Sequence, residues 1–213
     1  ERVLAPSCCR VPAEGMKVLA GSERARRSQL LVLELLRGEV GDATHTRESE
    51  LDQWCEKFGV HSSRFGSREQ PAADSSHPAI AVNLESCIQC TRCLRACREE
   101  QMNDVIGLAR RGAHAKIVFD VADTMGASSC VGCGECVQAC PTGALMPAGN
   151  VALERMDKTV DSVCPYCGVG CLLRYHVKDN QIRYVTGRDG PANKSRLCVT
   201  GRYGFDYVSH PER

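Results

Sequence analysis

Two cysteine runs of identical spacing stand out as candidate metal ligands. Each has the pattern C-x2-C-x2-C-x3-C, the first beginning at residue 87 and the second at residue 130. Short loops of this kind wrap three thiolates around one four-iron cluster and give the fourth thiolate to a second cluster. We therefore predict two [4Fe-4S] clusters with crossed ligands. The ligand sets are Cys87, Cys90, Cys93 and Cys140 for the first cluster, and Cys97, Cys130, Cys133 and Cys136 for the second.

Zinc is the competing interpretation of these runs, because C-x2-C pairs also build tetrahedral zinc sites. Zinc sites usually place a longer spacer between two such pairs. Here the same run of three cysteines plus one occurs twice, and the second run closes with Pro141. This is the spacing of bacterial ferredoxins, and it favours iron–sulfur clusters.

A third candidate site has the spacing C-x2-C-x3-C and one further cysteine after 26 intervening residues. We predict that it holds a third [4Fe-4S] cluster, so that iron is the metal at all three sites. Zinc competes more strongly here, because four cysteines with a hairpin between them also describe a zinc ribbon. The four predicted ligands are Cys164, Cys167, Cys171 and Cys198.

The segment before Cys198 is expected to fold back on itself. Residues 172–177 and 181–186 have the pattern of two strands, and the Asp179-Asn180 pair between them tolerates positive φ. Such a hairpin would return the chain, so that Cys198 meets the other three cysteines of its set.

Apolar residues and glycines near the double-cluster region have expected roles of their own. Ile88, Val131 and Val137 would keep water from the sulfurs. Backbone N–H groups at Gly132 and Gly134 can donate to the sulfurs, which raises the reduction potential of a cluster.

Three cysteines lie outside the runs. Cys8 and Cys9 are adjacent and cannot by themselves supply the four ligands of a two-iron cluster. Cys55 lies on the apolar stripe of an expected helix with no partner cysteine near it, so we predict a buried packing thiol.

Apolar periodicity predicts two helices in the first part of the chain, at residues 28–38 with Gly38 as the stop and at 49–58 with Gly59 as the stop. Residues 61–82 are rich in Pro, Ser and charge and are interpreted as a linker.

Between the cysteine runs, residues 98–109 are expected to be helical, and 115–121 to form a strand with Ile117, Phe119 and Val121 facing inward. We interpret the charged stretch 151–162 as a second connector.

Composition limits the function classes. Aromatic residues make up only 5% of the 213 residues, so metal sites are expected to supply much of the folding free energy. A net charge of +1 gives no support for nucleic-acid binding, and no apolar run is long enough to span a bilayer.

Fifteen cysteines without a signal peptide indicate a reducing compartment, the cytoplasm. Because the chain begins at Glu1 and ends in a motif-rich region, we expect it to be a piece of a longer protein.

Two groups of motifs resemble a known family. The run from Cys164 to Cys171, with the stretch Cys198 to Gly204, resembles the N-terminal cluster segment of molybdenum or tungsten bis-pterin formate dehydrogenases. The stretches 87–98, 103–107 and 136–145 are similar to the catalytic alpha subunit of the soluble, NAD-dependent branch of that family.

The resemblance implies an enzyme complex with further cofactors and partners. Formate would be oxidised at a molybdenum or tungsten bis-pterin centre in the remainder of the catalytic subunit, which this chain lacks. Electrons would pass through the clusters to a beta subunit that binds FMN and NAD. The Cys9-Arg10-Val11-Pro12 stretch is similar to the last ligand region of the family's two-iron domain, which makes Cys9 a possible [2Fe-2S] ligand.

Together these features predict an α+β fold in three parts. Residues 1–62 would be a remnant of a two-iron ferredoxin domain plus helices, 63–150 a ferredoxin-like domain with two [4Fe-4S] clusters, and 151–213 a small β-rich [4Fe-4S] subdomain of the bis-pterin oxidoreductase type.

The sequence departs from related patterns at two places. Relatives in complex I and in iron-only hydrogenases carry an H-x3-C-x2-C-x5-C cluster motif, but residues 41–60 offer only His45 and Cys55, at the wrong spacing, so we predict that this cluster is absent. The residue two after Cys198, usually a lysine in the family, is Thr200. A non-catalytic ferredoxin-like adaptor, or a relative of complex I or hydrogenases, remains an alternative.

Overall fold

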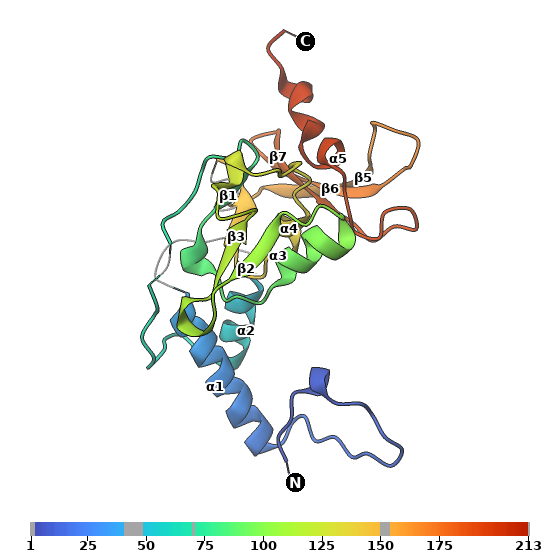
Figure 1. Ribbon diagram of the computed structural model, residues 1–213. Helices are drawn as coiled ribbons and strands as arrows, with labels where there is room; N and C mark the ends of the chain where they lie inside the picture. Colours follow the sequence, from blue (N-terminus) through green and yellow to red (C-terminus); the bar gives the residue numbers. More distant parts are fainter. Residues whose placement is uncertain (1–2, 41–48, 70, 150–153, 213) are drawn as a thin grey trace.

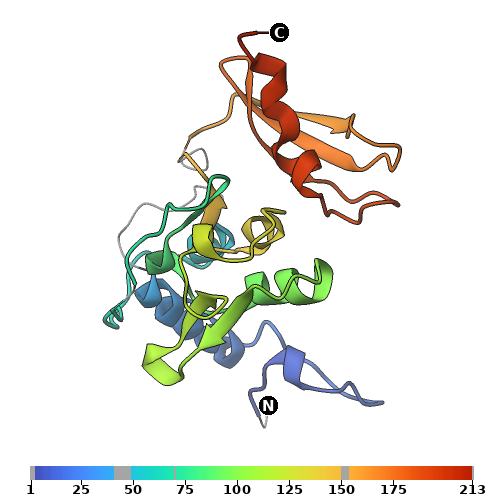
Figure 2. The same ribbon diagram turned by 45° about the horizontal axis from the view of Figure 1, so that its top comes forward.

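The computed structural model describes residues 3–40, 49–69, 71–149 and 154–212. Helices at the N-terminal end are followed by a central region of short helices and two small sheets, and then by a three-stranded sheet with a covering helix (Figure 1). The two ends of the chain lie at opposite ends of the molecule (Figures 1 and 2). None of the described helices combines the length and apolar content that crossing a membrane requires.

The first predicted helix forms as α1 (Glu23–Glu39), which begins at the N-cap Ser22. Gly38 lies inside α1, so the prediction that it ends the helix is wrong. A Cβ atom at Gly38 would lie 2.6 Å from Ser63 Oγ. This glycine therefore allows residue 63 to pack against the helix.

The second predicted helix forms as α2 (Glu50–Phe58) and ends at Gly59, whose left-handed backbone (φ 71°) confirms the predicted stop. The Ser49 hydroxyl donates to the carbonyl of Pro141 (3.2 Å), and the Leu51 N–H donates to the same oxygen (3.3 Å). Since Pro141 directly follows Cys140, α2 fixes the backbone beside a predicted cluster ligand.

The central region contains two antiparallel strand pairs. β1 (Ile80–Val82) pairs with β4 (Leu145–Pro147), and β2 (Ile106–Ala109) pairs with β3 (Lys116–Phe119). The short helices α3 (Arg92–Arg95) and α4 (Glu135–Ala139) follow the cysteine loops.

The predicted helix at 98–109 is wrong. A π-helical turn ends at Glu100, and the chain then turns through Met102 and Asp104, which both have positive φ (56° and 53°), into β2. Val105 and Ile106 are buried where the chain enters β2. Two adjacent apolar residues also fit one face of a helix, and this explains the wrong prediction.

The strand predicted at 115–121 forms as β3, with Ile117 and Phe119 buried as expected. Val121 lies beyond its end and is 93% exposed, so the inward direction predicted for it is wrong.

The C-terminal region is a sheet in the order β5-β6-β7, with bounds Lys158–Val163, Leu172–Lys178 and Gln181–Gly187. The hairpin between β6 and β7 forms as predicted, and Asp179 and Asn180 both have positive φ (50° and 58°). β5 lies where a connector was predicted. Its residues are almost all exposed, so its sequence lacks the apolar alternation that would have revealed it.

Candidate iron–sulfur sites

The first predicted ligand set meets around one cavity. Cys87, Cys90, Cys93 and Cys140 all line it, although Cys140 lies in the second cysteine run. The apolar walls include Leu84, Ile88, Ile117 and Leu145, which matches the shielding predicted for Ile88.

Burial and mutual repulsion act on these thiols. Burial raises the pKa of Cys93 to about 12, and charge repulsion from Cys140, Cys87 and Cys90 contributes to the rise. Four thiolates in such a site need positive charge among them, and iron supplies it while releasing the thiol protons. The donor set therefore fits an iron–sulfur cluster.

The second predicted set meets beside the first. Burial raises the pKa of Cys136, and repulsion from Cys93, Cys133, Cys130 and Cys97 adds to this effect. Cys97, from the first run, also raises the pKa of Cys130 and Cys133, and no other cysteine of the first run acts on these two thiols, so Cys97 lies with the cysteines of the second run. Because the charge of Cys93, from the first set, acts on Cys136, from the second set, the two candidate sites lie next to each other.

The third set meets at the edge of the C-terminal sheet. Burial raises the pKa of Cys171, as do the thiols of Cys164, Cys167 and Cys198. The Cys164 N–H donates to the Cys171 carbonyl (2.8 Å), which holds the two ends of the loop together.

Gly201 is packed against the sulfurs of the third set. It lies in α5 (Val199–Tyr203), where a Cβ atom would be 3.6 Å from Cys164 Sγ and 3.8 Å from Cys198 Sγ. The Gly201 N–H also donates to Cys198 Sγ at 3.4 Å. A larger residue at this position would reach toward the space that a cluster needs.

Backbone N–H groups point at sulfurs in the other two sites as well. The Gln89 N–H donates to Cys87 Sγ and the Gly132 N–H to Cys130 Sγ, both at 3.4 Å. The donor role predicted for Gly132 therefore matches the structure. Val137 packs against the core as expected, but Val131 is 57% exposed, so the prediction that it shields the sulfurs is wrong.

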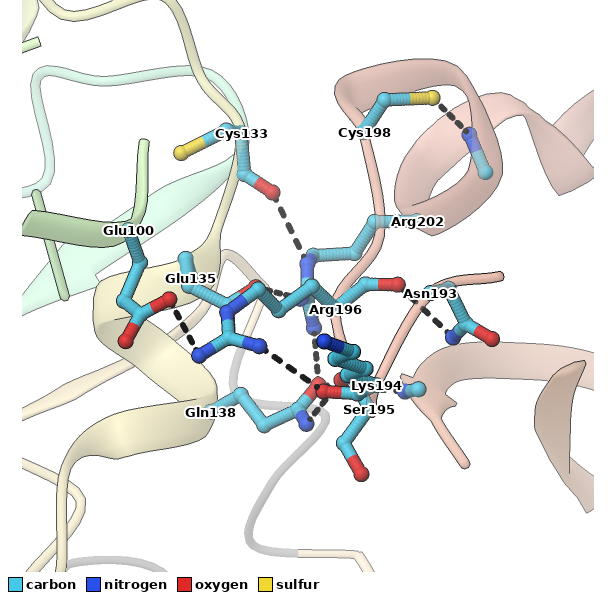
Figure 3. Close-up of polar contacts among 12 residues, drawn as sticks. Glu100, Cys133, Glu135, Gln138, Asn193, Lys194, Ser195, Arg196, Cys198 and Arg202 are labelled. Atoms are coloured by element: carbon cyan, nitrogen blue, oxygen red, sulfur yellow. Dashed lines mark hydrogen bonds and ion pairs between the residues drawn. The ribbon is translucent and has the colours of Figure 1, made fainter. Parts of the chain in front are cut away.

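Arg202, on α5, joins the second site to the third. Its Nε donates to the carbonyl of Cys133 (2.9 Å), its Nη1 to Gln138 Oε1 (2.9 Å), and its Nη2 pairs with Glu135 (2.9 Å). Figure 3 shows the side chain extending from the Cys198 side toward Cys133. Both charged side chains of the pair are less than a tenth exposed. No role for Arg202 is predicted from the sequence, because its partners lie more than 60 residues away in the chain.

A second bridge lies beside this one. Arg196 forms an ion pair with Glu100, and Gln138 Nε2 donates to the carbonyl of Ser195 (2.7 Å). In Figure 3, Arg196 and Glu100 lie on opposite sides of the boundary between the central and C-terminal regions. The third site is therefore held against the second by several polar contacts.

The remaining cysteines behave differently. Cys8 and Cys9 are exposed, with 3.7 Å between their sulfurs, so the ligand role of Cys9 stays a prediction. Cys55 is buried against Val40 and Leu51, which matches the predicted packing role.

His45 lies outside the described residues. Within the described part of the chain, no group of three or more His, Cys, Asp or Glu side chains is arranged to hold a single metal ion.

Family models match both cluster regions. Residues 86–144 match the 4Fe-4S dicluster domain, and residues 157–210 match the molybdopterin oxidoreductase Fe4S4 domain. The C-terminal match is thus to an iron–sulfur domain of molybdopterin oxidoreductases, and the central match is to 4Fe-4S dicluster domains in general.

Several curated proteins are similar over much of this chain. The alpha subunit of the NADPH-Fe(3+) oxidoreductase of Geobacter sulfurreducens is 31% identical over 97% of this chain and 25% of its own length. An NADH-quinone oxidoreductase subunit of Rhizobium meliloti is 29% identical over 100% and 26%, respectively. A Staphylococcus aureus protein provisionally named a formate dehydrogenase is 26% identical over 78% and 21%. The chain therefore spans about a quarter of the length of these relatives.

A solved structure has a similar fold over much of this chain. An NAD+-reducing [NiFe]-hydrogenase in its H2-reduced state superposes with a TM-score of 0.62 and 24% sequence identity, over 68% of this chain and 64% of that one. The family models and the relatives together identify an electron-transfer iron–sulfur segment related to larger oxidoreductases.

Proposed function

We propose that this chain carries electrons through three [4Fe-4S] clusters within a larger molybdenum- or tungsten-pterin oxidoreductase. The observation that supports this most directly is that twelve cysteines lie in three groups of four, with Cys140 beside the first run and Cys97 beside the second. Iron–sulfur clusters would supply the redox chemistry, and the residues of this chain place the clusters, exclude water and set their potentials.

The order of the sites suggests a path. The Cys164–Cys198 site would lie nearest the pterin centre, since its region matches the molybdopterin-type model. Arg202 connects this site to the Cys133 loop, and the second site adjoins the first through Cys136 and Cys93. Electrons would then leave toward a flavin subunit that uses NAD.

Formate oxidation is our proposal for the complete enzyme, with carbon dioxide reduction as the reverse reaction. It is supported by the resemblance of the Cys164–Cys171 run and by the similarity to the Staphylococcus protein. Purified full-length complex should contain molybdenum or tungsten and reduce NAD with formate. A complex that reacts with NADH but not with formate would contradict this substrate.

A second candidate is a role like that of the quinone-linked relative from Rhizobium. That relative is similar over the whole of this chain, at a higher identity than the Staphylococcus protein. In that case NADH would be the electron donor, and the clusters would carry electrons in the opposite direction from those of formate oxidation.

The crossed ligand assignment can be tested with paired variants. Cys93→Ala and Cys140→Ala should each remove about four iron atoms per chain and abolish the same cluster signal in electron paramagnetic resonance (EPR) spectra. Cys97→Ala should abolish a different signal. Cys55→Ala, which removes a buried thiol outside all three sets, is the control and should keep the full iron content. Loss of the same signal in Cys93→Ala and Cys97→Ala would contradict the assignment.

A further inference from the structure

The hydroxyl of Tyr203 is buried without a hydrogen-bond partner among the described residues. Tyr203 is the last residue of α5, directly after Arg202, and its ring packs against the core of the central region. A buried tyrosine hydroxyl normally finds an acceptor, because leaving a buried donor unpaired costs its full desolvation penalty. Its position therefore calls for an acceptor that the polypeptide itself does not supply.

The hydroxyl lies against the loop of the second cysteine set. A Cβ atom at Gly134 would be only 2.4 Å from the Tyr203 oxygen, so this glycine is what lets the hydroxyl approach the backbone. Gly134 stands between Cys133 and Cys136, and its φ of 73° turns the loop there. The hydroxyl thus reaches the centre of the loop that carries three of the four thiols.

The surroundings of the hydroxyl are rich in sulfur. Burial raises the pKa of Tyr203, Arg202 acts in the opposite direction, and the thiols of Cys136, Cys133 and Cys130 raise it further. These three cysteines therefore lie within electrostatic range of the ring. None of these three cysteine sulfurs accepts a hydrogen bond from the hydroxyl. The acceptor would therefore be an inorganic sulfide of the cluster that they hold, which carries negative charge and suits a neutral O–H donor.

We propose that the Tyr203 hydroxyl donates a hydrogen bond to a sulfur of the cluster held by Cys97, Cys130, Cys133 and Cys136, and thereby raises the reduction potential of that cluster. The inference rests on the proposed function, since it requires a cluster at this site. A hydrogen bond to sulfur stabilises the reduced cluster, which carries one more negative charge, so the bond shifts the potential upward.

The proposal gives α5 a role at two sites. Gly201 packs on the sulfurs of the third set, and two residues later Tyr203 reaches the second set. One short helix would then hold the third cluster and set the potential of its neighbour. Tyr203 is a positioning and tuning residue in this scheme, and it takes no part in the chemistry of a substrate.

The test is Tyr203→Phe in the full-length protein, because phenylalanine keeps the ring and removes only the hydroxyl. EPR-monitored redox titration should show a more negative midpoint potential for one cluster only, the one whose signal Cys97→Ala abolishes. The other two midpoint potentials should not move. Tyr184→Phe is the matched control, since Tyr184 lies on β7 and stacks on His176, and it should leave all three potentials unchanged.

A second measurement separates a hydrogen bond from a packing effect. Electron–nuclear double resonance in H2O and in D2O should show an exchangeable proton coupled to the second cluster in addition to backbone N–H protons such as that of Gly132, and Tyr203→Phe should remove this one coupling. Unchanged potential and unchanged proton coupling, with full iron content, would overturn the role of Tyr203 but leave the proposed function intact. Wild-type protein that holds no four-iron cluster at this site would overturn both.

Discussion

The buried ion pair between Arg202 and Glu135 shows how much depends on single side chains at the boundary between the central and C-terminal regions. Burial raises the pKa of Glu135, and Arg202 opposes this rise by stabilising the carboxylate. Removing one partner of such a pair leaves the other charge buried and uncompensated, which usually costs about 3–5 kcal/mol.

We expect Arg202→Met to lower the free energy of unfolding by about 3 kcal/mol, because Glu135 loses its partner and the Cys133 carbonyl loses a donor. The double variant Arg202→Met, Glu135→Gln should recover part of the loss. Denaturant unfolding of the four proteins in a double-mutant cycle measures both effects. The pair Arg174 and Asp161 is the control: both side chains are about two-fifths exposed, so Arg174→Met should cost little.

His176 on β6 provides a pH dependence that can be isolated. Burial lowers its pKa from 6.5 to about 4, and Arg174 adds to the effect; the ring stacks on Tyr184 at 4.0 Å. Between pH 6.5 and pH 4 the unfolded chain binds a proton that the folded chain does not. The stabilisation is therefore complete above pH 6.5 and is lost as the pH falls through this window.

From these pKa values we expect the free energy of unfolding to fall by about 1 kcal/mol between pH 7.5 and pH 5.5 on account of His176 alone. His176→Gln should remove this part of the pH dependence, measured as the difference from the parent protein in denaturant unfolding. His61→Gln, at an exposed position, should leave the dependence as it is. Identical slopes for parent and His176→Gln would rule out this contribution.

At the scale of elements, the loop of the second cysteine set and α5 depend on each other. Gly132 and Gly134 both have positive φ (67° and 73°), so a side chain at either position strains the backbone. They differ in the space around them. A Cβ atom at Gly134 would lie 2.3 Å from Arg202 Cδ, while one at Gly132 would have its nearest contact at 3.5 Å, to the ring of His77.

The two glycines therefore form a matched pair. Gly134→Ala should loosen α5 and increase amide hydrogen exchange across Val199–Tyr203, because Arg202 and Tyr203 must move away. Gly132→Ala has the same kind of backbone strain but no such clash, so exchange in α5 should stay near the parent rate. Mass spectrometry of exchanged peptides gives the comparison, and equal exchange in the two variants would contradict it.

Helices, strands and ligands were predicted with unequal success, for physical reasons. Three cysteines of each set and the Asp179-Asn180 turn lie close together in the chain, so spacing and turn chemistry are enough to predict that these residues meet. The assignment of the cysteines to clusters stays a prediction. β5 was missed because an exposed outer strand needs no apolar alternation. The contact between Arg202 and Glu135 spans 67 residues and leaves no local pattern.

At the scale of the whole molecule, the sites for metal lie in the apolar core. The central core includes Cys93, Cys97 and Cys136, and the C-terminal core includes Cys164. Without a cluster, the core of each region would lose the packing contacts that the cluster makes with these cysteines. We therefore expect folding of the central and C-terminal regions to be coupled to metal binding.

We expect removal of iron by an anaerobic chelator to unfold both regions, with loss of the far-ultraviolet circular dichroism of their strands. Addition of iron and sulfide under reducing conditions should restore the signal. The same thermal midpoint in iron-free and iron-loaded protein would show that the clusters contribute nothing to the fold.

The close approach of Tyr203 to the Gly134 loop also bears on how the protein is made. All the cysteines of the first two sets precede residue 141, whereas the side chains that cover the second set belong to residues 202 and 203. A ribosome builds the chain from its N-terminus, so the loop of the second set is synthesised some sixty residues before Arg202 and Tyr203 of α5. At ordinary translation rates this delay is about 3–12 seconds. We therefore expect the second site to be accessible to iron and sulfide delivery during this interval, before α5 packs against its loop.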